Sequence, residues 1–282
     1  MRIDLHTHST ASDGTDAPAD LVRKARAAGL DVVALTDHDT TAGWAAAAEA
    51  LPDRLTLVRG AEISCVAEGG ISLHMLGYLF DPAEPEFARA RELVRTDRVR
   101  RAEAMVARCR ELGAPITWER VREIAGGGAV GRPHVATALV EAGVVADVSA
   151  AFTPEWLKDG GRAFVGKYEI RAADAVRLIT GAGGVAVFAH PGAVTRGRTV
   201  SDATIAELAE AGLAGIEVDH MDHDDTMRAH LRGLAGELRL ITTGSSDYHG
   251  TRKTINLGEN TTDPESYGAI AELATGARPL TP

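Results

Sequence analysis

The sequence has only two cysteines, Cys65 and Cys109, which lie far apart and form no Cys-x-x-Cys pair. This argues against a disulfide framework and against a thiolate metal site, and favours a reducing cytosol. No apolar run approaches the length of a membrane-spanning helix, and the first residues include Asp4 and His6 where a signal peptide needs an apolar stretch. We therefore expect a cytoplasmic protein with no membrane partner.

The chain also has no excess of positive charge. Its 30 Lys and Arg residues are outnumbered by 40 Asp and Glu, which gives a net charge of −10. General attraction to nucleic acid is therefore not expected, so an anionic substrate must be attracted locally. We expect no stable binding to duplex nucleic acid, and a monomer or a homodimer. The 282 residues, 45% of them hydrophobic, suffice for one large domain or a domain with an insertion.

Near its start the sequence carries a His-x-His pair, His6 and His8. The alternation of apolar and polar residues before the pair predicts a short strand, from which both imidazoles point the same way. Neutral imidazole is a common ligand of divalent metal ions, and the carboxylate of Asp13 is near enough in sequence to join it. Taken alone, the pair fits two ordinary surface histidines equally well, because short motifs often occur by chance.

Strands and helices are predicted to alternate through most of the chain. The strands are expected at residues 31–36, 55–58, 72–80, 185–189, 215–218 and 238–243, with helices at 15–29, 41–50, 172–180, 202–211 and 224–235. Between residues 81 and 168 only helices are expected, at 84–112, 118–124, 133–142 and 146–152. We expect a βα barrel formed by residues 1–80 and 169–282, with a helical insertion at 81–168 that covers the active site.

Histidines and carboxylates recur at or near the ends of these predicted strands. The carboxyl ends of parallel strands in a barrel converge on one mouth, so residues far apart in sequence would meet there. Any one of them is more often an ordinary buried or surface residue. Their repetition favours a polynuclear metal site with nitrogen and oxygen ligands. The residues in question are His6, His8, His38, Glu62, His74, His190, Asp247 and His249.

Five motifs carry a family resemblance. They are Asp-Leu-His-Thr-His-Ser at 4–9, Thr-Asp-His-Asp at 36–39, Gly-Ala-Glu at 60–62, Ala-His-Pro at 189–191 and Ser-Asp-x-His at 246–249. Together they resemble the PHP (polymerase and histidinol phosphatase) family of metal-dependent phosphoesterases, over residues 1–80 and 170–260. The resemblance implies an α/β fold, a distorted (β/α)₇ barrel similar to the TIM barrel. It also implies two or three divalent ions, Mn²⁺, Fe²⁺ or Zn²⁺, at the mouth.

The same resemblance implies a ligand set for each ion. The first ion would be held by His6, His8, Glu62 and Asp247, the second by Glu62, His74 and His190, and the third by Asp13, His38 and His249. Such ions neutralise phosphoryl oxygens and lower the pKa of a water, so we expect in-line attack by hydroxide on phosphorus. Glu62, His190 and Asp247 are the expected catalytic residues. Asp4 and Asp37 are expected either to orient ligand histidines or to stabilise turns.

Within the predicted insertion, Gly-Arg-Pro-His at 131–134 resembles the subgroup of 3′,5′-nucleotide bisphosphate phosphatases and 5′-3′ oligoribonucleases. Pro133 in a first helical turn places Arg132 at a helix N-terminus. There the arginine and the free backbone N–H groups can together hold a phosphate. Arg132, His134, Lys167 and Arg196 are the expected substrate contacts. Lys167 is one of only four lysines, and an ordinary solvated role is its alternative.

The sequence therefore predicts a phosphoesterase that converts adenosine 3′,5′-bisphosphate to AMP. The alternatives are a 5′-3′ exonuclease on short oligoribonucleotides, a histidinol-phosphate phosphatase, and a metal-stabilised nucleotide-binding module without turnover. The Gly-Arg-Pro-His motif speaks against histidinol phosphate, and the full ligand set speaks against the module. His220, Asp222 and His223 share one predicted strand end but match no ligand of the family, so no metal role is assigned to them.

Overall fold

The computed structural model describes residues 1–126, 130–166 and 168–282. The chain forms two compact units: unit 1 consists of Met1–Arg91 with Glu169–Pro282, and unit 2 consists of Glu92–Tyr168. Each unit has a buried hydrophobic core of its own. Of the helices in the described ranges, none is long and apolar enough to cross a membrane.

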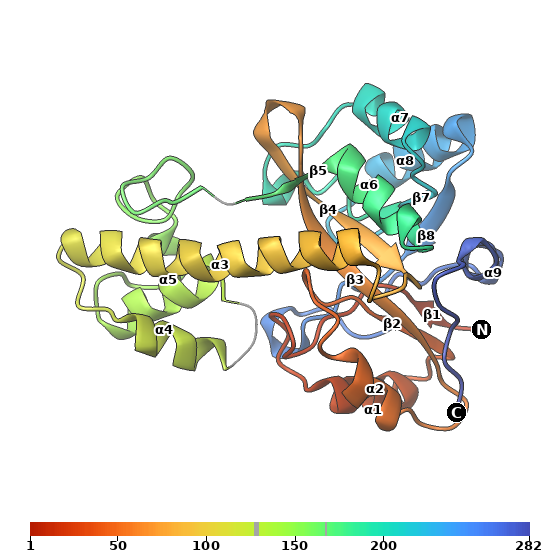
Figure 1. The fold of residues 1–282 in the computed structure, drawn as a ribbon, viewed down its shortest axis with the longest axis horizontal. Helices are drawn as coiled ribbons and strands as arrows, with labels where there is room; N and C mark the ends of the chain where they lie inside the picture. The colour runs from red at the N-terminus through yellow and green to blue at the C-terminus, as the bar shows by residue number, and fades with distance from the viewer. Residues whose placement is uncertain (127–129, 167) are drawn as a thin grey trace. The chain divides into compact units, whose positions relative to one another are not determined.

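Unit 1 is built on one sheet that nearly closes into a barrel (Figure 1). Its strands are β1 (Ile3–Asp4), β2 (Val32–Leu35), β3 (Thr56–Ala67), β4 (Ile71–Tyr78), β5 (Ile170–Arg171), β6 (Val185–Phe188), β7 (Gly215–Asp219) and β8 (Ile241–Gly244). Their order is β1-β2-β3-β4-β6-β7-β8, and β5 pairs with β3. A parallel bridge between Thr7 and Tyr248 links the segments that follow the two outermost strands. The predicted α/β barrel is thus confirmed.

Helices cover the outside of this barrel. They are α1 (Pro18–Ala27), α2 (Trp44–Glu49), α6 (Ala172–Gly181), α7 (Asp202–Glu210), α8 (Asp225–Leu238) and α9 (Pro264–Leu273). Helices α1 and α2 pack on each other and against β2 and β3, α6 packs on β4 and β6, and α8 packs on β7 and β8. The strands β2 and β6 are buried throughout, as parallel strands covered by helices must be. Pro18 occupies the first helical turn, where its missing N–H costs nothing.

The prediction for the third strand was wrong at its end. We expected the strand to stop at residue 58, but β3 continues to Ala67, and Glu62 lies in its middle. It continues because apolar residues persist on both sides of Glu62, and because Gly60 allows close packing: a Cβ there would lie 2.8 Å from the carbonyl oxygen of Gly77. Strand β4 runs antiparallel to both β3 and β6, and it carries His74. Glu62 and His74 therefore come from a hairpin and not from the ends of parallel strands.

Unit 2 is helical. It contains most of α3 (Pro85–Glu111), whose first residues belong to unit 1, together with α4 (Trp118–Ala125) and α5 (Arg132–Glu141). Helices α4 and α5 pack on each other around a core that includes Met105, Val121 and Leu139. The helix predicted at 146–152 is only a 3₁₀ turn, Ser149–Ala151. There the side chain of Asp147 accepts the Ala150 N–H at 2.9 Å, a local bond that favours a single turn over a helix.

Candidate active site

Glu62 lies at the centre of a cluster of imidazoles in unit 1. Its Oε2 is 3.2 Å from His6 Nε2, 3.1 Å from His8 Nε2 and 3.1 Å from His38 Nδ1. Its Oε1 is 2.8 Å from His74 Nδ1 and 3.0 Å from His190 Nε2. The Glu62 side chain is only 1% exposed, so its negative charge is balanced by the surrounding groups and not by bulk water. One buried carboxylate thus faces ring nitrogens with both oxygens, as a ligand that bridges two ions would.

Three atoms of this cluster form a group that suits a divalent ion. His6 Nε2 and His8 Nε2 are 3.0 Å apart, and they lie 3.5 and 3.4 Å from Asp247 Oδ1. These two nitrogens and one oxygen form a compact set, and Glu62 Oε2 lies 3.2 and 3.1 Å from the two nitrogens. Four ligands placed tetrahedrally at about 2.1 Å from an ion lie about 3.4 Å from one another. The separations among His6 Nε2, His8 Nε2 and Asp247 Oδ1, 3.0–3.5 Å, suit three of the ligands of such an ion.

Two further groups of ligand atoms overlap with this set. One consists of His38, Glu62 and His74, and the other of His8, Asp13, His38 and His249. The predicted ligands are thus brought together, although His38 is shared between these two groups, whereas the resemblance gave it to one ion. His249 Nδ1 lies 2.9 Å from the carbonyl oxygen of Asp247, so Nδ1 carries the proton and Nε2 keeps a lone pair toward Asp13, 3.4 Å away.

Two buried nitrogens in the cluster have no hydrogen-bond partner in the described part of the chain. They are the Nδ1 atoms of His38 and His74. Each faces an oxygen of Glu62, but not with the geometry of a hydrogen bond. A buried polar atom without a hydrogen bond is costly, and a metal ion at these lone pairs would remove that cost. The donor set therefore fits divalent metal ions.

The backbone turns sharply at two of the predicted ligands. His190 has φ 34° and Asp247 has φ 52°, in the left-handed region that residues other than glycine rarely adopt. Each residue follows closely on the end of its strand, β6 or β8. Such strain costs about 1–3 kcal/mol and is often found at functional sites. Here it directs the two side chains across the barrel mouth.

The electrostatics of the cluster also suit cation binding. Burial would raise the pKa of Glu62 and of Asp247, but the surrounding imidazoles hold both pKa values well below the usual range. Burial lowers the pKa of His38 to about 3, so this imidazole is neutral. At His8, burial lowers the pKa, but the bonds to Asp247 and Glu62 outweigh it and raise the pKa to about 9. A metal ion at His8 Nε2 must therefore replace a proton.

Comparison with known proteins identifies the family. The PHP domain family matches residues 4–76. A 3′,5′-nucleoside bisphosphate phosphatase of Chromobacterium violaceum is 36% identical over 251 residues, 88% of this chain and 87% of the relative. A 5′-3′ exoribonuclease of Haemophilus influenzae is 33% identical over 260 residues, 92% of this chain and 94% of the relative. This chain belongs to the PHP family.

A solved structure supports the same assignment. It is named as a metal-dependent phosphoesterase of Bifidobacterium adolescentis, and it superimposes with a TM-score of 0.88 at 37% identity, covering 97% of this chain and 96% of its own. The protein is accordingly a PHP metal-dependent phosphoesterase, a hydrolase of phosphoric esters, as the sequence predicted.

Strand β7 and the residue after it contribute two buried polar side chains: Glu217, which sequence reasoning passed over, and His220, to which it assigned no metal role. Glu217 lies 3.1 Å from His6 Nδ1 through Oε1, and its Oε2 accepts the backbone N–H of His190 at 2.8 Å. His220 Nε2 lies 3.3 Å from Asp247 Oδ2. The signal that could have revealed Glu217 is a single carboxylate in an otherwise apolar strand, residues 215–218.

Asp4 and Asp37, for which the sequence left two roles open, bind serine and backbone groups in this PHP barrel. Asp4 accepts hydrogen bonds from the Ser246 backbone and hydroxyl, and Asp37 accepts them from Ser9 and Ser12. They hold the backbone beside ligands and contact no imidazole of the cluster in the described structure. These hydrogen bonds favour the turn-stabilising role over a role in orienting ligand histidines.

Two other side chains near the cluster, His223 and Lys253, are engaged in hydrogen bonds or an ion pair. His223 Nδ1 lies 2.8 Å from the Val218 carbonyl oxygen, and its Nε2 accepts the Gly192 N–H at 3.0 Å, so this ring joins two loops and has no lone pair left for a metal. Lys253 Nζ lies 2.5 Å from Asp247 Oδ2, and its side chain is 23% exposed. Lys253 is a cation beside the cluster that sequence reasoning did not single out.

The predicted substrate contacts lie mostly outside unit 1. In unit 2, Arg132 donates to Asp159, and its guanidinium lies 5.7 and 5.8 Å from the rings of Phe152 and Phe164. His134 Nδ1 accepts the Gly131 N–H at 3.0 Å, which caps α5. Arg196 ends a 3₁₀ turn, Val194–Arg196, in unit 1. Lys167 lies outside the described residues. These four substrate roles stay predictions.

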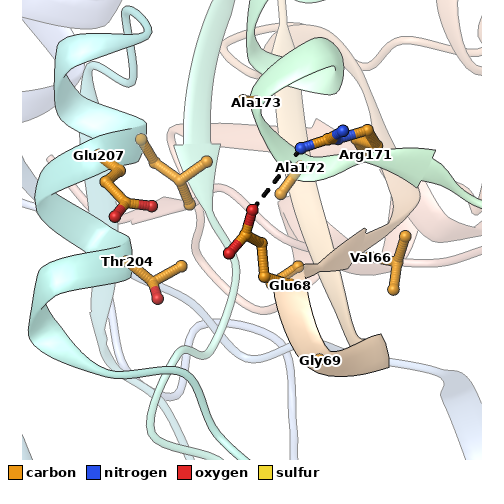
Figure 2. A pocket seen from close by; sticks show the side chains of 10 residues that line it. Val66, Glu68, Gly69, Arg171, Ala172, Ala173, Thr204 and Glu207 are labelled. Carbon is orange, nitrogen blue, oxygen red and sulfur yellow. Dashed lines mark ion pairs between the residues drawn. The ribbon is translucent and has the colours of Figure 1, made fainter.

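A cavity of about 480 Å³ lies elsewhere in unit 1, between the β3 end of the hairpin and the starts of α6 and α7 (Figure 2). Glu68 and Arg171 face each other across it with an ion-pair distance of 3.8 Å. Both side chains are largely exposed, so the pair contributes little. None of the residues that line the cavity belongs to the cluster around Glu62.

Proposed function

We propose that this PHP phosphoesterase acts on nucleotide phosphate esters, and that its preferred reaction removes the 3′-phosphate of nucleoside 3′,5′-bisphosphates such as adenosine 3′,5′-bisphosphate. The observation that carries the proposal is the gathering of imidazoles on both oxygens of Glu62. It is supported by the names of two relatives, one a nucleoside bisphosphate phosphatase and the other an exoribonuclease. Manganese, iron and zinc all suit this mixed ligand set.

Divalent ions held here would neutralise the phosphoryl oxygens and lower the pKa of a nearby water. The chain's own contribution is to hold them. Glu62 and Asp247 supply negative charge from buried positions, and the Glu62 carboxylate reaches ligand groups on both of its sides. His190 is held close to Glu62 Oε1 by the strained turn after β6. Lys253 places a partly exposed positive charge at the edge of the cluster, which suits an arriving phosphate.

Unit 2 is proposed to supply specificity for the nucleotide. Arg132 is 30% exposed and its partner Asp159 is 77% exposed, so their ion pair is worth little and a phosphate can replace Asp159. The guanidinium already lies over two aromatic rings, which orient it. We further propose that unit 2 covers the active site when substrate is bound, and that His134 stabilises the start of α5 beside Arg132.

The test is hydrolysis of three substrates by manganese-loaded protein: adenosine 3′,5′-bisphosphate, a 5′-phosphorylated oligoribonucleotide and histidinol phosphate. Phosphate release from the bisphosphate with the highest kcat/KM supports the proposal. Stepwise release of 5′ nucleotides at a higher kcat/KM makes the protein an exonuclease. A preference for histidinol phosphate overturns the argument from the insertion. Full metal loading without hydrolysis of any substrate would make it a binding module.

Two variants separate metal binding from substrate recognition. The double variant His6→Ala, His8→Ala should lose both metal and activity. Arg132→Ala should keep its metal but raise KM for the nucleotide roughly 10-fold or more, because a charge-assisted bond is worth about 1.5–3 kcal/mol. Arg122→Ala, at an exposed position of α4, is the matched control. Equal KM values for the Arg132 and Arg122 variants would contradict the role of Arg132.

A further inference from the structure

Strand β7 supplies no predicted metal ligand, although it lies between β6, which leads to His190, and β8, which leads to Asp247. Two fully buried polar residues, Glu217 within β7 and His220 directly after it, reach ligands that come from other strands. We propose that Glu217 and His220 are positioning residues: Glu217 fixes which nitrogen of His6 is free to bind metal, and His220 fixes which oxygen of Asp247 does so.

Glu217 uses both oxygens in this role. Its Oε1 lies 3.1 Å from His6 Nδ1 and also accepts the hydroxyl of Ser245, while Oε2 accepts the His190 backbone N–H at 2.8 Å. A carboxylate can only accept, so His6 must place a proton on Nδ1. His6 Nε2, which faces His8, Glu62 and Asp247, is then the nitrogen that would bind a metal ion. The same carboxylate holds the backbone of His190, so one side chain controls two ligands.

His220 acts on Asp247 by the same logic. The backbone N–H of Asp222 donates to His220 Nδ1 at 3.0 Å, so the proton of the ring is on Nε2. Nε2 lies 3.3 Å from Asp247 Oδ2, and Lys253 Nζ lies 2.5 Å from the same oxygen. Two donors therefore bind Oδ2 and leave Oδ1 facing His6 and His8. Asp247 is thereby prepared to bind an ion through one oxygen.

Neighbours of a metal ligand that fix its proton and orientation typically change metal affinity 10- to 100-fold when mutated. The variant Glu217→Gln is a sharp test because it keeps the shape of the side chain. The His190 N–H can only donate, so the amide oxygen must face it, and the amide NH₂ then faces His6 Nδ1. The His6 proton is forced onto Nε2, on the side where the metal would bind. A role limited to filling space would tolerate this change.

The experiment measures Mn²⁺ affinity and stoichiometry by calorimetric titration of metal-free protein, with circular dichroism to check the fold. We expect Glu217→Gln to bind Mn²⁺ 10- to 100-fold more weakly, and Glu237→Gln, an exposed residue of α8, to match the wild type. For the second position, His220→Leu should weaken binding, whereas His220→Gln should restore most of it because the amide can still donate to Asp247. This rescue keeps the test decisive if the Glu217 variant does not fold.

Wild-type Mn²⁺ affinity and stoichiometry in both Glu217→Gln and His220→Leu would overturn the inference. Equal weakening by His220→Leu and His220→Gln would overturn the part that concerns His220. Because the readout is metal binding and not turnover, the result does not depend on the proposed substrate.

Discussion

The central position of Glu62 makes Glu62→Gln the most informative single change. The two side chains have the same shape, but the amide has one oxygen and one NH₂ group. The carboxylate presents Oε2 to His6, His8 and His38, and Oε1 to His74 and His190. Whichever way the amide turns, one of these two sets loses its oxygen and faces an N–H donor instead. At least one bound ion should therefore be lost.

The size of the effect follows from what the carboxylate does. Removing a single group that stabilises the charge of a transition state costs 10²- to 10³-fold in rate. Glu62→Gln removes a bridging ligand and one negative charge at once, so we expect kcat/KM to fall by at least about 10³-fold, or about 4 kcal/mol. The contribution to binding affinity from parts of the substrate that do not contact the ions should change much less.

Metal content after dialysis against Mn²⁺, measured by plasma mass spectrometry, and the rate of phosphate release form the assay. Glu207→Gln, at an exposed position of α7, is the matched control and should keep full metal content and activity. The reasoning is refuted if Glu62→Gln keeps every equivalent of Mn²⁺ and more than about a tenth of the wild-type activity. Such a variant would have lost less than about 10-fold in activity, whereas removal of one charge-stabilising group costs 10²- to 10³-fold. Glu62 would then not bridge ions.

Three further outcomes are expected. Leu139→Ala, in the core of unit 2, should destabilise that unit by about 2–5 kcal/mol in urea unfolding and leave Mn²⁺ affinity unchanged, since every predicted ligand lies in unit 1; weaker Mn²⁺ binding would contradict it. Gly60→Ala should cost about 1–3 kcal/mol because its Cβ would lie 2.8 Å from the Gly77 oxygen, whereas Gly268→Ala, with open space in α9, should be neutral or slightly stabilising. Burial raises the pKa of the Cys109 thiol from 9.0 to about 11, so between these pH values the thiol ionises in the unfolded chain but not in the folded protein. As the pH rises through this range, the wild type should lose up to about 2.7 kcal/mol of its free energy of unfolding, and Cys109→Ala should not. Identical pH dependence of the unfolding free energy in the two proteins would contradict this.

Much of the fold could be predicted because its signals are local. The apolar run at β2 and the proline in the first turn of α1 mark elements that neighbouring residues alone specify. The predicted ligands His6, His8 and His38 could also be found from the sequence, because each follows a strand whose end is visible there. The βα rhythm then implied that they converge, which the distances around Glu62 confirm.

The parts that sequence reasoning missed depend on contacts between distant segments. Glu217 is one carboxylate in a buried strand, and its partners His6 and His190 lie 211 and 27 residues away. Its local signal, a single carboxylate in an otherwise apolar strand, does not say which residues it contacts. The same holds for Lys253, whose link to Asp247 depends on the path of the loop after β8. Propensity and periodicity report the neighbours of a residue along the chain, and these roles are set by neighbours across the barrel.

The wrong end of β3 is instructive because it concerns the residue on which the whole cluster depends. Where a strand ends, its chain turns away from the neighbouring strands. Few imidazole rings on those strands can then approach both oxygens of a carboxylate at that position. In the middle of β3, Glu62 has His38 beside it from the β2 side and His74 diagonally across on β4, since Glu62 pairs with Leu76 and Ser64 pairs with His74. Neighbouring strands are about 4.8 Å apart, so one carboxylate reaches both. In the described part of the barrel, the antiparallel strand β4 therefore has a chemical consequence: it lets one carboxylate face imidazoles on both of its sides.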